Sequence, residues 1–257
     1  MSSATYHTNF LTPVPAEAQG INQNGIVRSF VASKKNYLVF KRLYDILFSV
    51  FIIIVVLSWL LPLIAILIKL NSKGSVFFKQ KRTGLNGKPF SCLKFRTMIS
   101  NEEADERQAD ENDDRVTGIG KFLRRTNIDE LPQFFNVLAG DMSIVGPRPH
   151  MITDCIRFSF VISSYQFRNL VRPGITGLAQ VKGYHGPTAD YESIIIRYYW
   201  DAQYVRKAGL WLDIKIIGIT IIQSLSNLIQ VGFHISGKTR KSVVMDNLSV
   251  RKTSSYL

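Results

Sequence analysis

Cysteine is scarce in this sequence: its 257 residues include only two, Cys92 and Cys155, which lie far apart in the chain. That scarcity argues against a disulfide framework and against a zinc site built from cysteines. Acidic residues are also in deficit, since 19 of them face 32 lysines and arginines and leave a net charge of +13. Such an excess predicts an anionic partner, such as lipid headgroups, a nucleic acid or a phosphorylated substrate.

Several familiar catalytic motifs are missing as well. The sequence has no HExxH, no GxSxG and no GxGxxG after a strand, and the Gly-Lys pair in 117–121 lacks the spacing of a P-loop. The four histidines are scattered, and we interpret them as surface or polar-core residues: His7, His150, His185 and His234. These competing chemistries therefore fit the sequence poorly.

Three segments show no periodicity of regular structure. Residues 1–36 are mostly polar and predict a disordered arm, and residues 233–257 predict a basic, flexible tail. Residues 101–115 hold eight acids and two arginines, so the rest of the chain is more basic than its net charge indicates. We interpret this acidic stretch as a solvated loop, with a metal-binding role as the alternative.

The longest apolar run covers residues 46–68 without a charge. A straight helix of this length reaches roughly 35 Å, enough to cross a hydrocarbon core of about 30 Å, which favours a single-pass anchor. Pro62, however, removes a backbone donor within the run, Ser58 lies one turn before it, and basic residues flank the run on both sides. A re-entrant helix over 37–72, which bends and returns to the same side, fits equally well.

Two short segments after this run predict strands. Residues 76–80 and 90–98 have the composition and alternation of strands and are separated by a turn rich in glycine and asparagine. In the second segment the alternation places Lys94 and Arg96 on the same face.

Residues 121–149 carry the densest pattern in the chain. Asn127 followed by Glu130 resembles a capping box, apolar residues then recur at helical spacing, and Gly140 is a natural stop. Asp129 and Glu130 would then lie at a helix N-terminus, where free backbone donors favour a phosphate. Arg124 and other nearby arginines could add bidentate contacts. An Asp-Glu pair alone can be explained by compensation of the helix dipole, but the arginines need a further anion.

A second apolar segment lies near the C-terminus. Residues 210–229 are rich in isoleucine and leucine, and their polar residues recur three, four or seven positions apart: Asp213, Thr220, Ser224 and Asn227. This spacing gives a narrow polar stripe and a wide apolar face. A core helix and a helix lying in the membrane surface both fit.

Five motifs in this order resemble those of the bacterial sugar transferases, also called monotopic polyprenyl-phosphate phosphoglycosyl transferases. They are KRLYD (41–45), FFKQKRTG (77–84), KFRTM (94–98), the R…DELPQ…GPRP block (124–149) and RPGITGLAQVKG (172–183). Within the family the chain is similar to the undecaprenyl-phosphate glucose and galactose phosphotransferase branch, which transfers hexose-1-phosphates. That branch usually carries an N-terminal bundle of further membrane helices, which we expect this chain to lack.

The resemblance implies a mostly helical α/β monotopic membrane protein. Its re-entrant helix would occupy 37–72, and amphipathic interfacial helices and a small cytoplasmic catalytic domain would occupy 73–232. It implies a place at the bacterial inner membrane, with the catalytic domain facing the cytoplasm. The family's usual Ser-Pro break falls on Ser58 and Trp59 here, and the proline follows three residues later at Pro62.

The resemblance also implies an activity. A sugar-1-phosphate, with a hexose as the expected sugar, would pass from a UDP-sugar to undecaprenyl phosphate through a covalent intermediate, releasing UMP, as the first membrane step of polysaccharide or glycoconjugate assembly. The implied nucleophile is Asp129, and Glu130 with Asp129 would bind magnesium. The basic residues implied at the substrate phosphates are Lys94, Arg124 and Arg148, with Arg82 and Arg96 as further candidates. No nucleic acid is expected as a partner, and a homodimer is compatible with the family.

Two rival functions remain. A membrane-anchored scaffold could use its basic domain to bind anionic lipid or a partner enzyme. An aspartyl-phosphate hydrolase is a rival enzyme, but the DxD pattern common in such enzymes is absent around Asp129.

Overall fold

The structure is a computed structural model that describes residues 23–99, 113–184, 186 and 191–230. Most of the predicted N-terminal arm, most of the acidic stretch and all of the predicted tail lie outside the described residues. Helices dominate the described part, and two sheets of two strands each accompany them. The prediction of a mostly helical α/β protein is therefore confirmed.

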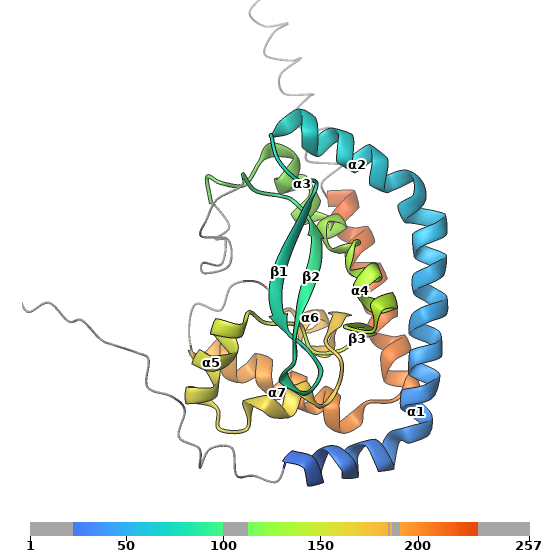
Figure 1. The fold of residues 1–257 in the computed structure, drawn as a ribbon, viewed down its shortest axis with the longest axis vertical. Coiled ribbons are helices and arrows are strands. Elements are labelled where there is room, and N and C mark those ends of the chain that lie inside the picture. Colours follow the sequence, from blue (N-terminus) through green and yellow to red (C-terminus); the bar gives the residue numbers. More distant parts are fainter. Residues whose placement is uncertain (1–22, 100–112, 185, 187–190, 231–257) are drawn as a thin grey trace, which may run out of the picture.

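One long helical segment runs along one side of the molecule (Figure 1). It consists of α1 (Gln23–Ile52), the π-helix η2 (Ile53–Leu57) and α2 (Ser58–Asn71). The helix starts at Gln23, inside the arm that the sequence analysis expected to be disordered. The reason is visible in the sequence, because apolar residues recur over 26–31 at spacings that suit a helix.

The axis of this segment turns between α1 and α2 (Figure 1). The π-helix η2 lies at the turn, and Pro62 lies in the second turn of α2, where it cannot donate a backbone hydrogen bond. The Ser58 hydroxyl donates to the carbonyl oxygen of Ile54 at 2.6 Å. A π-helix next to a proline is a recognised cause of a bend, so the structure bends where the sequence places Pro62 and Ser58.

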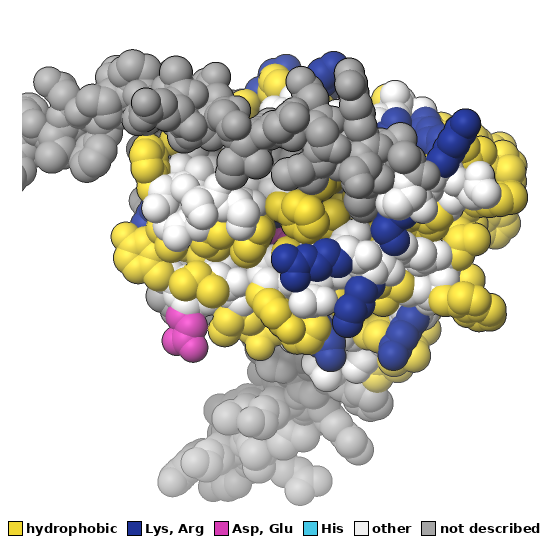
Figure 2. All heavy atoms as spheres, turned by 90° about the horizontal axis from the view of Figure 1, so that it is seen from below, with side chains coloured by type: hydrophobic (Ala, Val, Ile, Leu, Met, Phe, Trp, Pro, Cys, Tyr) yellow, Lys and Arg dark blue, Asp and Glu magenta, His cyan; other side chains and the backbone are white. Residues whose placement is uncertain are grey.

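Two described helices are long and apolar enough to cross a membrane: the segment Ser33–Asn71 and the C-terminal helix Leu210–Gln230. Both expose large apolar side chains, such as Phe51 and Leu70 on the first and Trp211 and Ile222 on the second. Viewed from below, hydrophobic side chains lie among lysines and arginines, and acidic side chains are sparse (Figure 2). Apolar surface mixed with cations indicates association with a membrane.

The polar residues of α1 attach this helix to the rest of the protein. The Lys41 ammonium forms a buried ion pair with Asp213 of the C-terminal helix, at 2.6 Å between Nζ and Oδ2. Asp45 Oδ1 accepts a hydrogen bond from the backbone nitrogen of Ile144 at 3.1 Å. Arg42 donates to two carbonyl oxygens at the end of α4 (Gln133–Ala139). The KRLYD motif therefore holds the apolar helix in place and does not contribute to the cleft described below.

An antiparallel hairpin of β1 (Phe77–Thr83) and β2 (Pro89–Phe95) packs against α4, which in turn packs against α1 (Figure 1). The turn between the strands, η3 (Leu85–Gly87), includes Asn86 at φ 54°, a left-handed conformation that asparagine tolerates. Both predicted strands are thus confirmed.

The outer side of β2 is held by a side chain. The Asn136 amide oxygen accepts from the backbone nitrogen of Leu93 at 2.9 Å, and its nitrogen donates to the carbonyl oxygen of Ser91 at 2.8 Å. Since Asn136 lies on α4, these two bonds tie the helix to the hairpin.

The remaining elements complete the described part of the protein together with the C-terminal helix. They are α3 (Gly118–Arg125), η5 (Ile128–Glu130), β3 (Ser143–Val145), α5 (Ile152–Val161), η6 (Tyr165–Leu170), β4 (Gly174–Thr176), α6 (Leu178–Val181) and α7 (Tyr191–Lys207). Strands β3 and β4 pair in parallel. The main apolar core lies between α1, α4, β3 and the C-terminal helix, and it includes Phe134, Val137, Tyr204 and Ile216.

Two family motifs meet at a glycine contact next to β3 and β4. A Cβ on Gly146 would lie 2.3 Å from the carbonyl oxygen of Arg172, and a Cβ on Gly174 would lie 2.1 Å from the nitrogen of Gly146. Only glycine permits such an approach of two backbones. This contact fixes the GPRP segment, and with it Arg148.

Candidate active site

The Asp-Glu pair lies in a short turn of 3₁₀-helix. α3 ends at Arg125, and Asn127 adopts a left-handed conformation with φ 57°. Asn127 makes no side-chain cap, so the predicted capping box is wrong. A left-handed asparagine reverses the chain after α3, and η5 then carries Asp129 and Glu130.

α4 begins only at Gln133, so Asp129 and Glu130 lie in the turn before this helix and not at its N-terminus, where they were predicted. Gly140 ends α4 at φ 91°, as predicted.

Glu130 is held by two cations. Its Oε1 lies 2.6 Å from Lys94 Nζ and 2.6 Å from an Arg148 terminal nitrogen, and the other Arg148 terminal nitrogen donates to Oε2 at 3.2 Å. Burial opposes ionisation of Glu130, but the charges of Arg148 and Lys94 outweigh it and hold the pKa of this carboxyl well below its usual range. Glu130 is therefore a permanent anion that fixes two positive side chains.

Asp129 has a different environment. The residue is 7% exposed, and no described residue donates a hydrogen bond to its carboxylate. Burial raises the pKa of Asp129 to about 6, and the charge of Lys94 only partly offsets this effect. A buried carboxylate with raised basicity and open lone pairs can act as a nucleophile.

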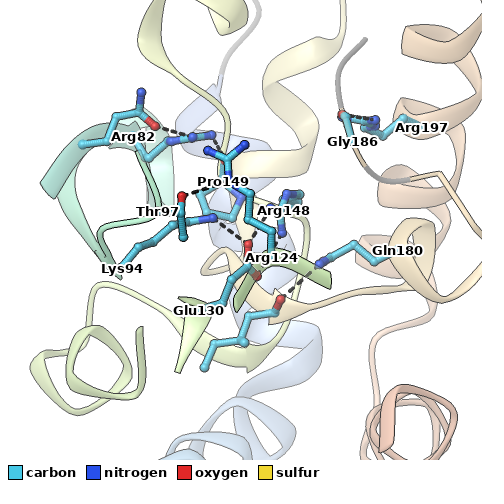
Figure 3. Close-up of polar contacts among 12 residues, drawn as sticks. Arg82, Lys94, Thr97, Arg124, Glu130, Arg148, Pro149, Gln180, Gly186 and Arg197 are labelled. Carbon is cyan, nitrogen blue, oxygen red and sulfur yellow. Dashed lines mark hydrogen bonds and ion pairs between the residues drawn. The ribbon is translucent and has the colours of Figure 1, made fainter. Parts of the chain in front are cut away.

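Arg124 and Arg82 extend the positive surface around the pair (Figure 3). Arg124 Nε donates to the hydroxyl of Thr97 at 2.8 Å, which orients the guanidinium without neutralising it. One terminal nitrogen of Arg82 donates to the carbonyl oxygen of Pro149 at 2.9 Å, and the other donates to Gln80. Both arginines keep their charge available for an anion.

Arg96 is engaged elsewhere. Its terminal nitrogens donate to the carbonyl oxygens of Lys73 and Ser72 at 2.6 and 2.8 Å and to the Ser72 hydroxyl at 3.0 Å. These contacts hold the chain just after α2. A role of Arg96 at a substrate phosphate stays a prediction, while its contacts connect it to the apolar helix.

All predicted polar site residues line one cleft of about 990 Å³: Arg82, Lys94, Arg96, Arg124, Asp129, Glu130 and Arg148. The opposite wall comes from α6, α7 and the C-terminal helix, and it includes Gln180, Arg197 and Thr220. Phe48 and Ile52 of α1 and Ile221 of the C-terminal helix line the cleft as well. The polar site is therefore continuous with apolar side chains of the two apolar helices.

Sequence reasoning missed several lining residues. His150 directly follows the GPRP segment; at 5% exposed it is a polar-core residue, one of the two predicted environments, but it also lines the cleft, which was not predicted. Arg197 and Gln180 come from segments without a catalytic signature. The position of His150 beside Pro149 was the one available signal.

The two carboxylates can be tested as magnesium ligands. Among the described residues no group of three His, Cys, Asp or Glu side chains could hold a metal ion, so a closed zinc-type site is not formed there. Magnesium commonly takes one or two carboxylates together with substrate phosphates and water. Asp129 has open oxygens and Glu130 retains free lone pairs, so this pair fits magnesium once a phosphate is bound.

Comparison with known proteins places the chain in a family. Residues 36–227 match the bacterial sugar transferase family. The chain is 48% identical over 191 residues to a UDP-glucose:undecaprenyl-phosphate glucose-1-phosphate transferase of Klebsiella pneumoniae, which covers 74% of this chain and 41% of the relative.

Two other relatives are similar. One from Aeromonas hydrophila, a UDP-N-acetylgalactosamine-undecaprenyl-phosphate N-acetylgalactosaminephosphotransferase, is 46% identical over 186 residues, or 72% of this chain and 43% of the relative. The other, from Caulobacter vibrioides, carries the same name as the Klebsiella protein. It is 45% identical over 182 residues, which cover 70% of this chain and 68% of the relative. The chain thus spans less than half the length of the first two relatives. With a family match over most of its length, the chain belongs to the bacterial sugar transferases.

Proposed function

We propose that this protein transfers a sugar-1-phosphate from a UDP-sugar, with a hexose as the expected sugar, to undecaprenyl phosphate and releases UMP. The observation that carries the proposal is the buried Asp129 carboxylate, to which no described residue donates a hydrogen bond and which shares one cleft with Lys94, Arg124 and Arg148. The names of the relatives support the substrate classes, since they specify UDP-sugars and undecaprenyl phosphate. The reaction would be the first membrane step of polysaccharide or glycoconjugate assembly.

In the first step an Asp129 oxygen attacks the sugar-bearing phosphorus of the UDP-sugar. The bond from this phosphorus to the bridging oxygen breaks, UMP leaves, and the phosphosugar remains on the aspartate. A carboxylate approaches a diphosphate only if the negative charge of the diphosphate is offset. Lys94, Arg124 and Arg148 supply that charge, and Glu130 holds two of them in position.

In the second step an oxygen of the lipid phosphate attacks the same phosphorus. The bond to Asp129 breaks, the carboxylate is regenerated, and the lipid carries the phosphosugar as a diphosphate. No histidine base is required, because the attacking phosphate is already ionised at pH 7. The apolar part of the cleft, between Phe48 and Ile221, offers a surface for the polyprenyl chain.

Magnesium is the cofactor that the donor set fits. Asp129 and Glu130 would hold the ion together with the substrate phosphates, and the ion would supply further charge compensation for the diphosphate. Chelation is expected to abolish turnover, and added magnesium or manganese is expected to restore it.

The topology that goes with this function is a re-entrant helix over 37–72 at the inner membrane, with the cleft facing the cytoplasm, where nucleotide sugars are made. The bend at η2 and Pro62 supports this topology, as do the basic residues on both flanks of the run.

The test is retention of a labelled sugar phosphate. The full-length protein in detergent is incubated with a panel of UDP-sugars labelled in the sugar, without lipid acceptor, and then denatured. The wild type is expected to retain label and to release UMP, and Asp129→Asn is expected to do neither while remaining folded. Asp114→Asn, at an exposed position, is the matched control.

Glu130→Gln separates this enzyme from a membrane scaffold. The substitution is expected to lower turnover more than tenfold, a loss of at least about 1.4 kcal/mol of transition-state stabilisation. A scaffold would tolerate both substitutions. Equal label on wild type and Asp129→Asn would refute the role of this aspartate.

A further inference from the structure

Four buried side-chain nitrogens of residues that line the cleft have no hydrogen-bond partner among the described residues. Three of them are Nε of Arg82, Nε2 of His150 and Nε of Arg197. They come from β1, from the segment before α5 and from α7. Buried donors are almost always paired, so three together indicate an absent acceptor.

Arg197 is the clearest case. It is 7% exposed, and among the described residues its side chain makes one hydrogen bond, from a terminal nitrogen to the carbonyl oxygen of Gly186 at 2.9 Å. Asp201 lies one turn further along α7 and accepts from Arg168 at 2.7 and 3.0 Å. No described carboxylate forms an ion pair with Arg197. Asp201 therefore acts on Arg197 without pairing with it, and a buried guanidinium is costly without a paired anion.

His150 adds a neutral donor. Its Nδ1 is hydrogen-bonded to the Tyr165 hydroxyl, and that hydroxyl has no other described partner. Burial, together with the charges of Arg168, Arg197, Arg82 and Arg148, holds the pKa of His150 well below its usual value. If the Tyr165 hydroxyl donates to Nδ1, the remaining proton of the neutral ring lies on Nε2, which is then a donor surrounded by cations.

Another buried arginine nitrogen in the cleft, Nε of Arg96, also lacks an acceptor. It belongs to a guanidinium whose terminal nitrogens are already bound to the carbonyl oxygens of Lys73 and Ser72, just after α2.

Arg82 and Arg197 lie on opposite sides of the site in Figure 3, with Arg148 and Arg124 between them. The free donors of Arg82 and Arg197 therefore belong to opposite walls of the cleft.

We propose that Arg197 and His150, faced by Arg82 from the other wall, form a second phosphate subsite in the cleft, separate from Lys94 and Glu130. A phosphate group offers several acceptor oxygens and a negative charge, which suit these three nitrogens and a guanidinium that has no ion pair among the described residues. Given the proposed function, on which this part rests, two phosphates could reach the subsite. One is the nucleoside-bearing phosphate of the donor, which leaves as UMP, and the other is the phosphate of the lipid acceptor.

The first measurement does not depend on turnover. The full-length protein in an uncharged maltoside detergent is titrated with inorganic phosphate by calorimetry. Arg197→Gln is expected to weaken phosphate binding at least tenfold, equivalent to about 1.4 kcal/mol. Arg197→Lys is expected to recover part of the loss, because it keeps the charge but not the planar fork. Arg206→Gln, at an exposed position on the same helix, is expected to bind as the wild type does.

The second measurement identifies the source of the phosphate. A rise of at least tenfold in the KM for the UDP-sugar in the donor-only labelling reaction, with unchanged label at saturation, assigns the subsite to the nucleotide. A rise in the KM for lipid phosphate, with normal donor-only labelling, assigns it to the acceptor. His150→Phe is expected to shift the same KM in the same direction.

Two results would overturn the subsite. One is a wild type that does not bind phosphate, and the other is an Arg197→Gln variant with unchanged phosphate affinity. A different result would refute the proposed function alone: the wild type retains no label on Asp129, while phosphate binding still depends on Arg197. Since Arg197→Gln removes one hydrogen bond to a carbonyl oxygen, its melting temperature without phosphate is expected to stay near that of the wild type.

Discussion

The buried ion pair between Lys41 and Asp213 gives the sharpest prediction of stability. The side chains are 9% and 4% exposed, and Asp213 also accepts hydrogen bonds from the hydroxyls of Tyr37 at 3.0 Å and Tyr204 at 2.8 Å. Lys41→Met leaves a buried carboxylate that lacks its counter-ion. Breaking such a pair from one side costs about 3–5 kcal/mol in the free energy of unfolding.

The double-variant cycle isolates the pair. Lys41→Met combined with Asp213→Asn removes both charges. The amide oxygen can accept from one tyrosine hydroxyl and the amide nitrogen can donate to the other, so most of the loss is expected to be recovered. The free energies of unfolding are measured by denaturant titration in detergent micelles. The coupling energy is expected to be at least about 2 kcal/mol.

Lys35→Met is the control for this cycle, because Lys35 lies on the same helix and is exposed. Its effect is expected to stay within about 0.5 kcal/mol. A Lys41→Met variant as stable as Lys35→Met, or a double variant whose losses simply add, would refute the claim that this pair anchors the apolar helix.

Three further predictions follow from the structure. Arg96→Lys keeps the charge but loses the paired hydrogen bonds of the guanidinium to the carbonyl oxygens after α2. The free energy of unfolding is therefore expected to fall by about 1–2 kcal/mol, with little change in the KM for substrate. A raised KM with unchanged stability would instead indicate a phosphate contact. His150 stays neutral in the folded state but binds a proton when unfolded below its ordinary pKa of 6.5, so stability falls as the pH drops through this value. From pH 7 to 5.5 the wild type is expected to lose about 1 kcal/mol more than His150→Phe in denaturant titrations, and parallel curves would contradict this reasoning. In a cysteine-free background, Ser3→Cys and Ser254→Cys are expected to resist an impermeant thiol reagent in intact cells; labelling of position 3 alone would show that the helix crosses the membrane.

Much of the site could be predicted because its signals are local. The Asp-Glu pair, the two strands and the stop at Gly140 each depend on residues close together in sequence. The exact start of α4 could not be predicted in this way. Asn127 suits both a helix cap and a left-handed turn, and the reversal of the chain after α3 decides between them.

Contacts between distant segments lay beyond the sequence. Arg96 alternates with Lys94 as a site residue would, yet its guanidinium reaches carbonyl oxygens more than twenty residues earlier. In the sequence Arg197 looks like an ordinary arginine of a helix, with Asp201 one turn away as its expected partner. The fold shows that Asp201 pairs with Arg168. Charge alone does not reveal which arginine is already paired.

The side chain of Asn136 has a consequence for the behaviour of the protein in concentrated solution. A hairpin of two strands ends in backbone edges to which a strand from another molecule can be added, and such addition is a common start of aggregation. On the outer side of β2 the Asn136 amide occupies the backbone groups of Leu93 and Ser91, as a neighbouring strand would. An incoming chain would first have to displace it. Asn136→Leu removes this obstacle, so the variant is expected to self-associate through the exposed backbone of β2. Light scattering at high protein concentration would detect this association first.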